Sequence, residues 1–324
     1  QRMSRGAYLV ESAAADLGMP GDSLLRRISD VLLARRGFYL LLLLVPPLLW
    51  LGVVYLGSLF ALLAESLFSI DDFSGVVVRE PTLATFRQLL QPANLDVIIR
   101  TVTIAATVTI LAVIVAFPIA YYAARYARGR TKAAFYLLIM MPLWSSYLVK
   151  VYAWKLLLAK EGAIGWTFDA VGLRPLLDAV LAIPVIGGPS LSTSYIGMVL
   201  VFLYLWIPFM VLPVQAALER VPGNLIEASG DLGASPRQTF RRVILPLALP
   251  GIVAGAIFTF SLTLGDYIVP EIVGPSSLIL GQVVYIQQGT AGNVPLAAAF
   301  SVVPIVIMGL LLAIAKRMGA FDAL

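Results

Sequence analysis

The stretch 227–246 reads Glu-Ala-Ser-Gly-Asp-Leu-Gly-Ala-Ser-Pro-Arg-Gln-Thr-Phe-Arg-Arg-Val-Ile-Leu-Pro and forms a polar insert between two strongly apolar segments. Asn224 is a candidate N-cap for a first short helix, and Gly233 permits a turn after it. Ser235 and Pro236 are typical of the N-cap and first position of a second helix. The stretch therefore predicts two short helices with an apolar tip, a shape suited to docking in a groove of a partner.

The segments around this insert predict a membrane protein. Hydrophobic residues make up 60% of the 324 residues and charged residues only 13%, which is too little polar surface for a soluble globular domain. An apolar helix of roughly 18 residues or more spans a bilayer. We predict an all-α polytopic fold with six transmembrane helices, at residues 38–64, 97–124, 133–158, 194–217, 248–270 and 295–315.

Basic residues predict the orientation of these spans. Four clusters, before span one, between spans two and three, after span four and after span six, all fall on one side of a six-span protein. By the positive-inside rule this side is cytoplasmic, so both termini and the stretch 227–246 are predicted to be inside. Residues 23–36 have an amphipathic helical pattern that predicts an interfacial helix within a cytoplasmic segment, 1–36.

Composition excludes several kinds of chemistry. The chain has no Cys and no His, which excludes thiolate and imidazole metal sites and His-based acid–base catalysis. It also lacks the G-x-x-x-x-G-K-[ST] pattern of a P-loop, so any ATP and Mg²⁺ must be held by another subunit. The net charge of +5 comes from basic residues at span ends and indicates topology, with no nucleic-acid partner.

The insert resembles the "EAA" loop of permease subunits in bacterial ABC importers. That motif reads Glu-Ala-Ala, three residues, Gly, nine residues, Ile, one residue, Leu-Pro. Five positions of this chain fall on its register, with Ser229 and Val243 as mild departures: Glu227, Ala228, Gly233, Leu245 and Pro246. Without this spacing, an ordinary amphipathic loop helix on the membrane would be the simpler interpretation.

The resemblance implies a type I importer permease that catalyses no bond chemistry and needs no cofactor of its own. Its partners would be a second homologous permease, two ATP-binding cassette subunits, membrane lipid and a periplasmic or lipid-anchored solute-binding protein. The chain would lie in the bacterial cytoplasmic (inner) membrane. Glu227 would anchor the loop by an ion pair or cap, and Gly233 would make the bend. The residues implied in coupling to the ATPase are Glu227, Ala228, Ser229, Gly233, Ala234, Phe240, Leu245 and Pro246.

Three further stretches, at 141–154, 205–213 and 265–274, resemble permeases of spermidine/putrescine importers. The same permease branch also serves ferric iron, phosphonate and opine importers. The resemblance therefore implies a polyamine as the leading candidate solute, with ferric iron, a phosphonate or an opine as alternatives. The expected organisation is the cytoplasmic segment 1–36, a first helix and periplasmic loop at 37–96, a transmembrane core at 97–317 containing the coupling loop 222–247, and a cytoplasmic tail at 318–324.

A polyamine pathway needs carboxylates and aromatic faces. Asp266 is expected late in span five with Glu271 near its outer end, and an ionisable residue inside a span is a functional candidate. The aromatic candidates at comparable depth are Trp144, Tyr147, Tyr152, Tyr204 and Tyr267. An alternative of about equal weight is that Asp266 forms a structural ion pair with Lys150 of span three.

Two other function classes, a secondary transporter and an intramembrane enzyme, have weaker support in the sequence. A secondary transporter would need internal repeats and carboxylates near mid-bilayer, and neither is evident. An intramembrane enzyme would need a nucleophile and a base, for which Ser146 and Lys150, four residues apart on one helical face, are the formal candidates. No substrate-orienting residues accompany that pair.

Overall fold

The structure is a computed structural model that describes residues 36–71 and 73–317. The chain divides into two units, Gln1–Leu62 and Leu63–Leu324, which are described separately. The predicted interfacial helix at 23–36 and the tail at 318–324 lie outside the described residues, apart from Arg36.

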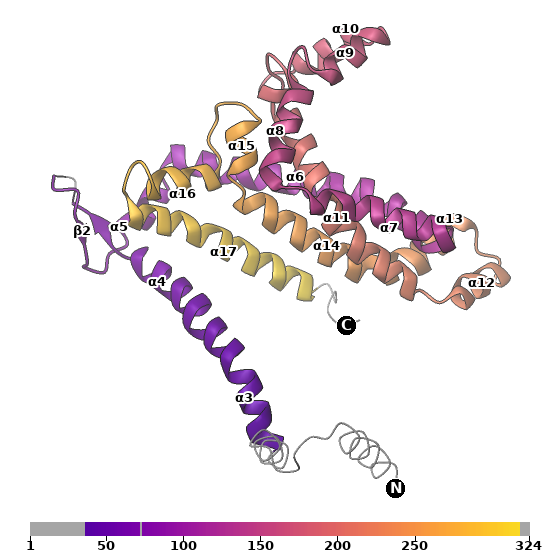
Figure 1. Cartoon of the computed structure of the whole chain (residues 1–324), viewed down its shortest axis with the longest axis horizontal. Helices are drawn as coiled ribbons and strands as arrows, with labels where there is room; N and C mark the ends of the chain where they lie inside the picture. The colour runs from indigo at the N-terminus through magenta and orange to yellow at the C-terminus, as the bar shows by residue number, and fades with distance from the viewer. Residues whose placement is uncertain (1–35, 72, 318–324) are drawn as a thin grey trace, which may run out of the picture. The chain divides into compact units, whose positions relative to one another are not determined.

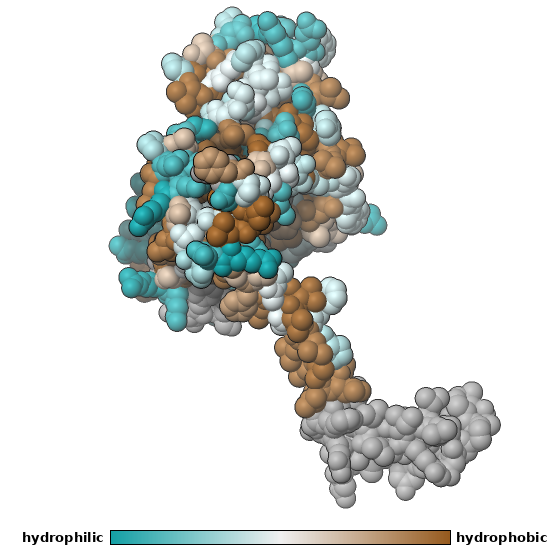
Figure 2. All heavy atoms as spheres, turned by 90° about the vertical axis from the view of Figure 1, so that its left-hand side faces the viewer, coloured by the Kyte–Doolittle hydropathy of each residue, from teal (hydrophilic) through white to brown (hydrophobic). Residues whose placement is uncertain are grey.

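The first unit is built around one long apolar helix. It comprises α3 (Arg36–Leu49), a π-helical stretch η1 (Trp50–Leu56) and α4 (Gly57–Glu65), which runs just past the unit boundary. In the candidate span Leu40–Glu65, no residue of the most apolar stretch is buried, and Figure 2 shows the apolar surface of this helix in brown. A helix that is apolar on all sides suits lipid or neighbouring helices, which agrees with the first predicted span.

The second unit begins with a small hairpin and then becomes helical (Figure 1). Strands β1 (Ser69–Ile70) and β2 (Val77–Val78) pair antiparallel, with Ser69 opposite Val78. The helices that follow are α5 (Ala84–Leu89), α6 (Pro92–Arg125), α7 (Gly129–Trp144), α8 (Tyr147–Leu158), α9 (Ala163–Ala170), α10 (Arg174–Leu181), the 3-10 turn η2 (Leu191–Thr193), α11 (Tyr195–Arg220), α12 (Gly223–Asp231), α13 (Pro236–Thr239), the π-helical η3 (Phe240–Ile244), α14 (Leu245–Gly265), α15 (Ile268–Ile272), α16 (Leu280–Gln288) and α17 (Val294–Arg317).

Helices α6, α11 and α14 form the packed centre of this unit. Small residues let their backbones approach, as is usual where helices associate in a membrane. Ala112, Ala116 and Ala120 are fully buried along α6. On α14, a Cβ added at Gly251 would lie 2.4 Å from the Pro213 carbonyl oxygen of α11, so only glycine fits there.

The third predicted span is not one continuous helix. Helices α7 and α8 meet at an angle of 96° across Ser145 and Ser146, and together they can form a single broken span. Pro142, which cannot donate a backbone N–H, precedes the serine pair, and such sites are common causes of sharp kinks. With this pair counted as one span, the described residues contain six spans, as predicted.

The fifth predicted span is also shifted. Its helix is continuous from Pro236 to Gly265, so it begins inside the expected loop and ends before residue 270. Asp266 therefore lies just beyond the end of α14, where the backbone becomes extended, instead of late in the span. The short helix α15 follows it.

Candidate functional site

The coupling loop consists of α12, α13 and η3, which confirms the prediction of two short helices separated by a turn. Gly233 has a φ of +77°, in the left-handed region that glycine adopts most easily. The Ala234 N–H donates to the Ser229 carbonyl at 3.1 Å, and the Gly233 N–H donates to the Gly230 carbonyl at 2.8 Å. These two bonds are a Schellman motif, which satisfies carbonyls at the end of α12 and makes the bend.

The start of each loop helix is set differently. Ser235 caps α13 as predicted, with Pro236 in the first position. The Ser235 N–H also donates to Oε1 of Gln238 at 2.7 Å. The prediction that Asn224 caps α12 is wrong: the helix already begins at Gly223, after Pro222, and its N-terminus has no side-chain cap.

Two side chains fold the loop inward onto the membrane helices. Phe240 packs edge-on against Phe117 of α6, with ring centroids 5.6 Å apart, and Ile226 joins the same apolar cluster. The ring of Phe240 is thus directed at α6, and its assignment to ATPase coupling stays a prediction. Ser229 is tied to Thr239 by a hydroxyl hydrogen bond of 2.9 Å, which links α12 to α13.

The outward face of the loop is partly apolar. Leu232 is 88% exposed and Leu225 is 44% exposed, while Glu227 and Ala228 are also exposed. Among the described residues Glu227 forms no ion pair and α12 has no side-chain cap, so neither form of the predicted anchor is seen within this part of the chain. The pattern predicts an apolar tip, and Leu232 is the most exposed large apolar side chain of this loop. Ala234 and Leu245 are half-buried, and Pro246 is exposed at the start of α14.

Leu232→Asp is expected to reduce the amount of ATPase subunit that co-purifies with the chain by about tenfold, because a docked carboxylate would lose its water without gaining a partner. The chain itself should still fold, since the leucine side chain is already in solvent. Leu176→Asp is the matched control, because Leu176 is 57% exposed on α10, far along the chain from the coupling loop. Unchanged co-purification for Leu232→Asp would show that the tip makes no contact.

Asp266 lies where the end of α14 meets the broken span formed by α7 and α8. Its Oδ1 accepts the Val269 N–H at 2.8 Å, which fixes the start of α15. Its other oxygen, Oδ2, accepts the hydroxyl of Tyr147 from the first turn of α8. The carboxylate therefore links the break after α14 to the break between α7 and α8.

Lys150 does not pair with Asp266. Its Nζ donates to the Pro142 carbonyl at 2.7 Å, and the Ser145 hydroxyl donates to the same oxygen at 3.2 Å. This carbonyl needs side-chain donors because the helix stops at Trp144, before the residue that would have bonded to it. The ion pair between Lys150 and Asp266, the alternative considered from sequence, is therefore absent. The helix break explains the position of the Lys150 ammonium, because it exposes the carbonyl to which that ammonium bonds.

The aromatic candidates do not form one cage. Tyr147 stacks on the buried Trp206 with ring centroids 6.0 Å apart, whereas Tyr204 contacts Trp154 at 5.2 Å. Tyr267 stacks on Tyr285 at 4.9 Å. Trp144 and Tyr152 are 74% and 55% exposed. Of these candidates only Tyr147 forms a hydrogen bond with Asp266, and Trp206 stacks on Tyr147.

Glu271 has a separate role. Its Oε2 accepts a hydrogen bond from Nε2 of Gln282 at 3.0 Å, which connects α15 to α16. The Gln282 Oε1 in turn accepts the Ile279 N–H at 3.2 Å. Glu271 thus connects α15 to α16 in the segment between α14 and α17, and no side-chain hydrogen bond joins it to Asp266 among the described residues.

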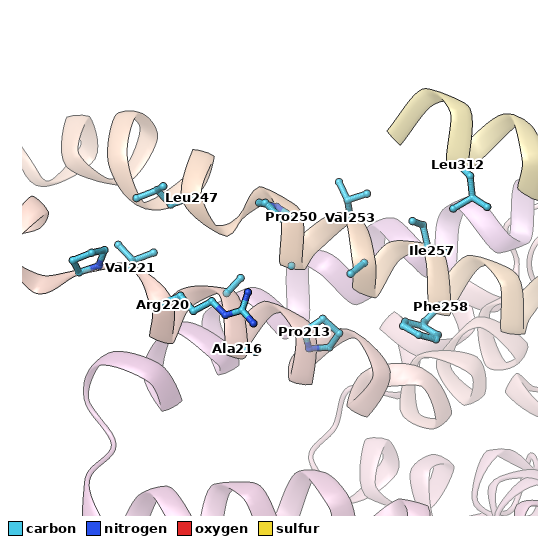
Figure 3. A pocket seen from close by; sticks show the side chains of 14 residues that line it. Pro213, Ala216, Arg220, Val221, Leu247, Pro250, Val253, Ile257, Phe258 and Leu312 are labelled. Atoms are coloured by element: carbon cyan, nitrogen blue, oxygen red, sulfur yellow. The ribbon is translucent and has the colours of Figure 1, made fainter. Parts of the chain in front are cut away.

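A cavity of about 530 Å³ lies near the root of the coupling loop. It is mostly apolar and is lined by α11, α14 and Leu312 of α17, with Arg220 among the lining side chains (Figure 3). Neither Asp266 nor any of the predicted aromatic candidates lines it.

Comparisons with known proteins agree with this architecture. Residues 116–320 match the family described as "Binding-protein-dependent transport system inner membrane component". The chain is 56% identical to the inner membrane ABC transporter permease protein YdcU of Escherichia coli (strain K12), over 95% of this chain and 98% of that protein. It is 28% identical to the spermidine/putrescine transport system permease protein PotB of Salmonella typhimurium (strain LT2), over 87% of this chain and 90% of that protein.

The fold also matches solved structures. A bacterial alginate ABC transporter, solved in complex with an alginate pentasaccharide-bound periplasmic protein, has a chain that aligns with a TM-score of 0.65. The alignment covers 93% of this chain and 99% of that chain, at 14% sequence identity.

Proposed function

This chain belongs to the family of binding-protein-dependent transport system inner membrane components, as a permease subunit of an ABC importer, and we propose that its solute is a polyamine such as spermidine or putrescine. It would form half of the translocation pathway. The inner membrane localisation of the family and the multi-pass fold agree with this role.

One observation supports a cationic solute most directly. Asp266 is half-buried where the end of α14 meets the broken span of α7 and α8, and no Lys or Arg among the described residues forms an ion pair with it. A carboxylate in such a place is costly unless it is paired or used. A polyamine carries several ammonium groups on an apolar chain, so it can supply the missing cation. Tyr147 and Trp206 provide aromatic faces beside the carboxylate.

The relatives support the same solute class. PotB carries spermidine/putrescine in its name, and the resemblance to it extends over most of this chain. Both carboxylate oxygens of Asp266 accept hydrogen bonds in this conformation, so Tyr147 would have to release its bond before an ammonium group takes that place.

The remaining subunits follow from the same proposal. A second, similar permease would complete the pathway, two ATPase subunits would bind the coupling loops, and a solute-binding protein would dock on the outer side. ATP binding would close the ATPase dimer, and the loops would pass this motion to the membrane helices. The pathway would alternate between outward and inward access, with hydrolysis resetting it.

The test is ATP hydrolysis by the reconstituted complex with its binding protein, measured with putrescine, spermidine, ferric ion, a phosphonate and an opine. We expect stimulation by the polyamines and none by the others. Stimulation by the phosphonate alone would reject the cationic pathway and direct attention to Lys150, whose ammonium is bonded to the Pro142 carbonyl at the same break and has no carboxylate partner among the described residues. The permease assignment would remain in either case.

A further inference from the structure

A polar cluster at the inner end of α11 is not explained by the coupling loop alone. Glu219 accepts three hydrogen bonds on the same oxygen, Oε1. The donors are Lys132 Nζ at 2.9 Å, the Tyr136 hydroxyl at 3.1 Å and Gln215 Nε2 at 3.1 Å. Lys132 and Tyr136 belong to the first two turns of α7, so Glu219 joins α7 to α11.

This cluster lies at the root of the coupling loop. Glu219 is four residues before Gly223, where α12 begins. The connecting residues are held as well, because Nη2 of Arg125 at the end of α6 donates to the Val221 carbonyl at 3.0 Å. A displacement of α12 is therefore expected to pull on the segment 219–222, which the bonds of Glu219 and Arg125 tie to α7 and α6.

Helix α7 leads from this cluster to the Asp266 site. It is 16 residues long, or about 24 Å at about 1.5 Å per residue. Its far end contains Pro142, whose carbonyl accepts the Lys150 ammonium across the break. On the other side of the break, Tyr147 bonds to Asp266. Helix α7 thus contacts the loop root at its beginning, and at its end it is bonded to α8, the helix that carries Tyr147 (Figure 1 shows the course of α7).

We propose that Glu219 is the positioning residue that makes α7 move with the coupling loop, so that the break beside Asp266 changes when the ATPases close. This inference rests on the proposed function of the loop. Rigid elements with polar contacts at both ends are suited to carrying such motion. Ion pairs that are partly exposed contribute little to folding stability, and the side chains of Lys132 and Glu219 are 37% and 30% exposed. The cluster is thus better suited to transmission than to holding the fold.

The experiment follows the distance between α7 and the loop in the full complex. The chain has no cysteine, so spin labels can be placed at Leu138→Cys on α7 and Arg237→Cys on α13 without removing native thiols. In the wild-type background, the distance should stay constant between the nucleotide-free and vanadate-trapped states, because α7 and the loop move together. In Glu219→Gln, the distance should change by several ångströms between these states.

Uptake and ATP hydrolysis supply the second readout. Glu219→Gln should lower solute uptake at least about tenfold, while ATP hydrolysis by the same complex falls less than about twofold. Exchanging the charges, with Glu219→Lys and Lys132→Glu together, should restore part of the uptake. Glu161→Gln is the matched control, since Glu161 is an exposed glutamate before α9.

Three outcomes would overturn the inference. A distance that changes equally in the wild type and in Glu219→Gln would mean that α7 does not follow the loop. Unaffected uptake in Glu219→Gln, or a charge exchange that restores nothing, would remove Glu219 from coupling. The distance measurement needs no solute, so the inference about Glu219 can hold even if the polyamine proposal fails. A complex that binds no ATPase would instead contradict the permease role.

Discussion

Gly233→Asp is expected to lower solute uptake at least about tenfold while the protein still inserts and assembles in the membrane. A clash at the bend is the simplest reason for such a loss. The structure gives a different one, because a Cβ added at Gly233 would meet no atom within 4 Å. The positive φ of +77° costs a non-glycine residue about 1–2 kcal/mol, and aspartate is among the residues that tolerate it best.

The loss should therefore come from the charge. Gly233 follows Leu232, the 88% exposed tip of the loop, so a carboxylate there would be buried against the ATPase without a partner. Gly233→Asn is the matched control, since asparagine has nearly the same shape and also tolerates this backbone conformation. Uptake of labelled polyamine in membrane vesicles should remain substantial for Asn and be lost for Asp. Wild-type uptake in Gly233→Asp would contradict the coupling assignment, and equal loss in both variants would assign the effect to the backbone.

Asp266→Asn is expected to lower polyamine uptake at least about tenfold, because it removes the negative charge that Asp266 offers to an ammonium at this junction. An amide oxygen can still accept the Val269 N–H, so the start of α15 should be kept. Uptake should be measured as a function of solute concentration, to separate weaker binding from slower transport.

Two further variants distinguish charge from structure. Tyr147→Phe removes the hydrogen bond to Asp266 but keeps the carboxylate, so its uptake should exceed that of Asp266→Asn. Combining Asp266→Asn with Lys150→Met should not restore uptake, because Lys150 is bonded to the Pro142 carbonyl and not to Asp266. Restoration in the double variant would instead support a structural ion pair that forms in another conformation.

Much of the fold could be predicted from the sequence because it depends on local and solvent-driven properties. Apolar length decides which segments can cross a bilayer, and the six predicted spans are present when α7 and α8 are counted as one. The bend of the coupling loop was also predictable, since Gly233, Ser235 and Pro236 each favour one backbone geometry. No sequence pattern predicts the Glu219 cluster, because its four side chains come from two helices that lie far apart in the sequence.

The sequence by itself determined the membrane-spanning class, the family resemblance and the positions of the loop helices, since these follow from hydropathy and from residues that act on their own backbone. Only the tertiary structure decided which side chains meet. In the structure Phe240 packs against Phe117, and Asp266 accepts a hydrogen bond from Tyr147. Lys150 donates to the Pro142 carbonyl, which the helix break leaves without its backbone partner. Hydropathy does not set the rotation of a helix about its axis or the point at which it breaks, and those two quantities determine every contact between spans.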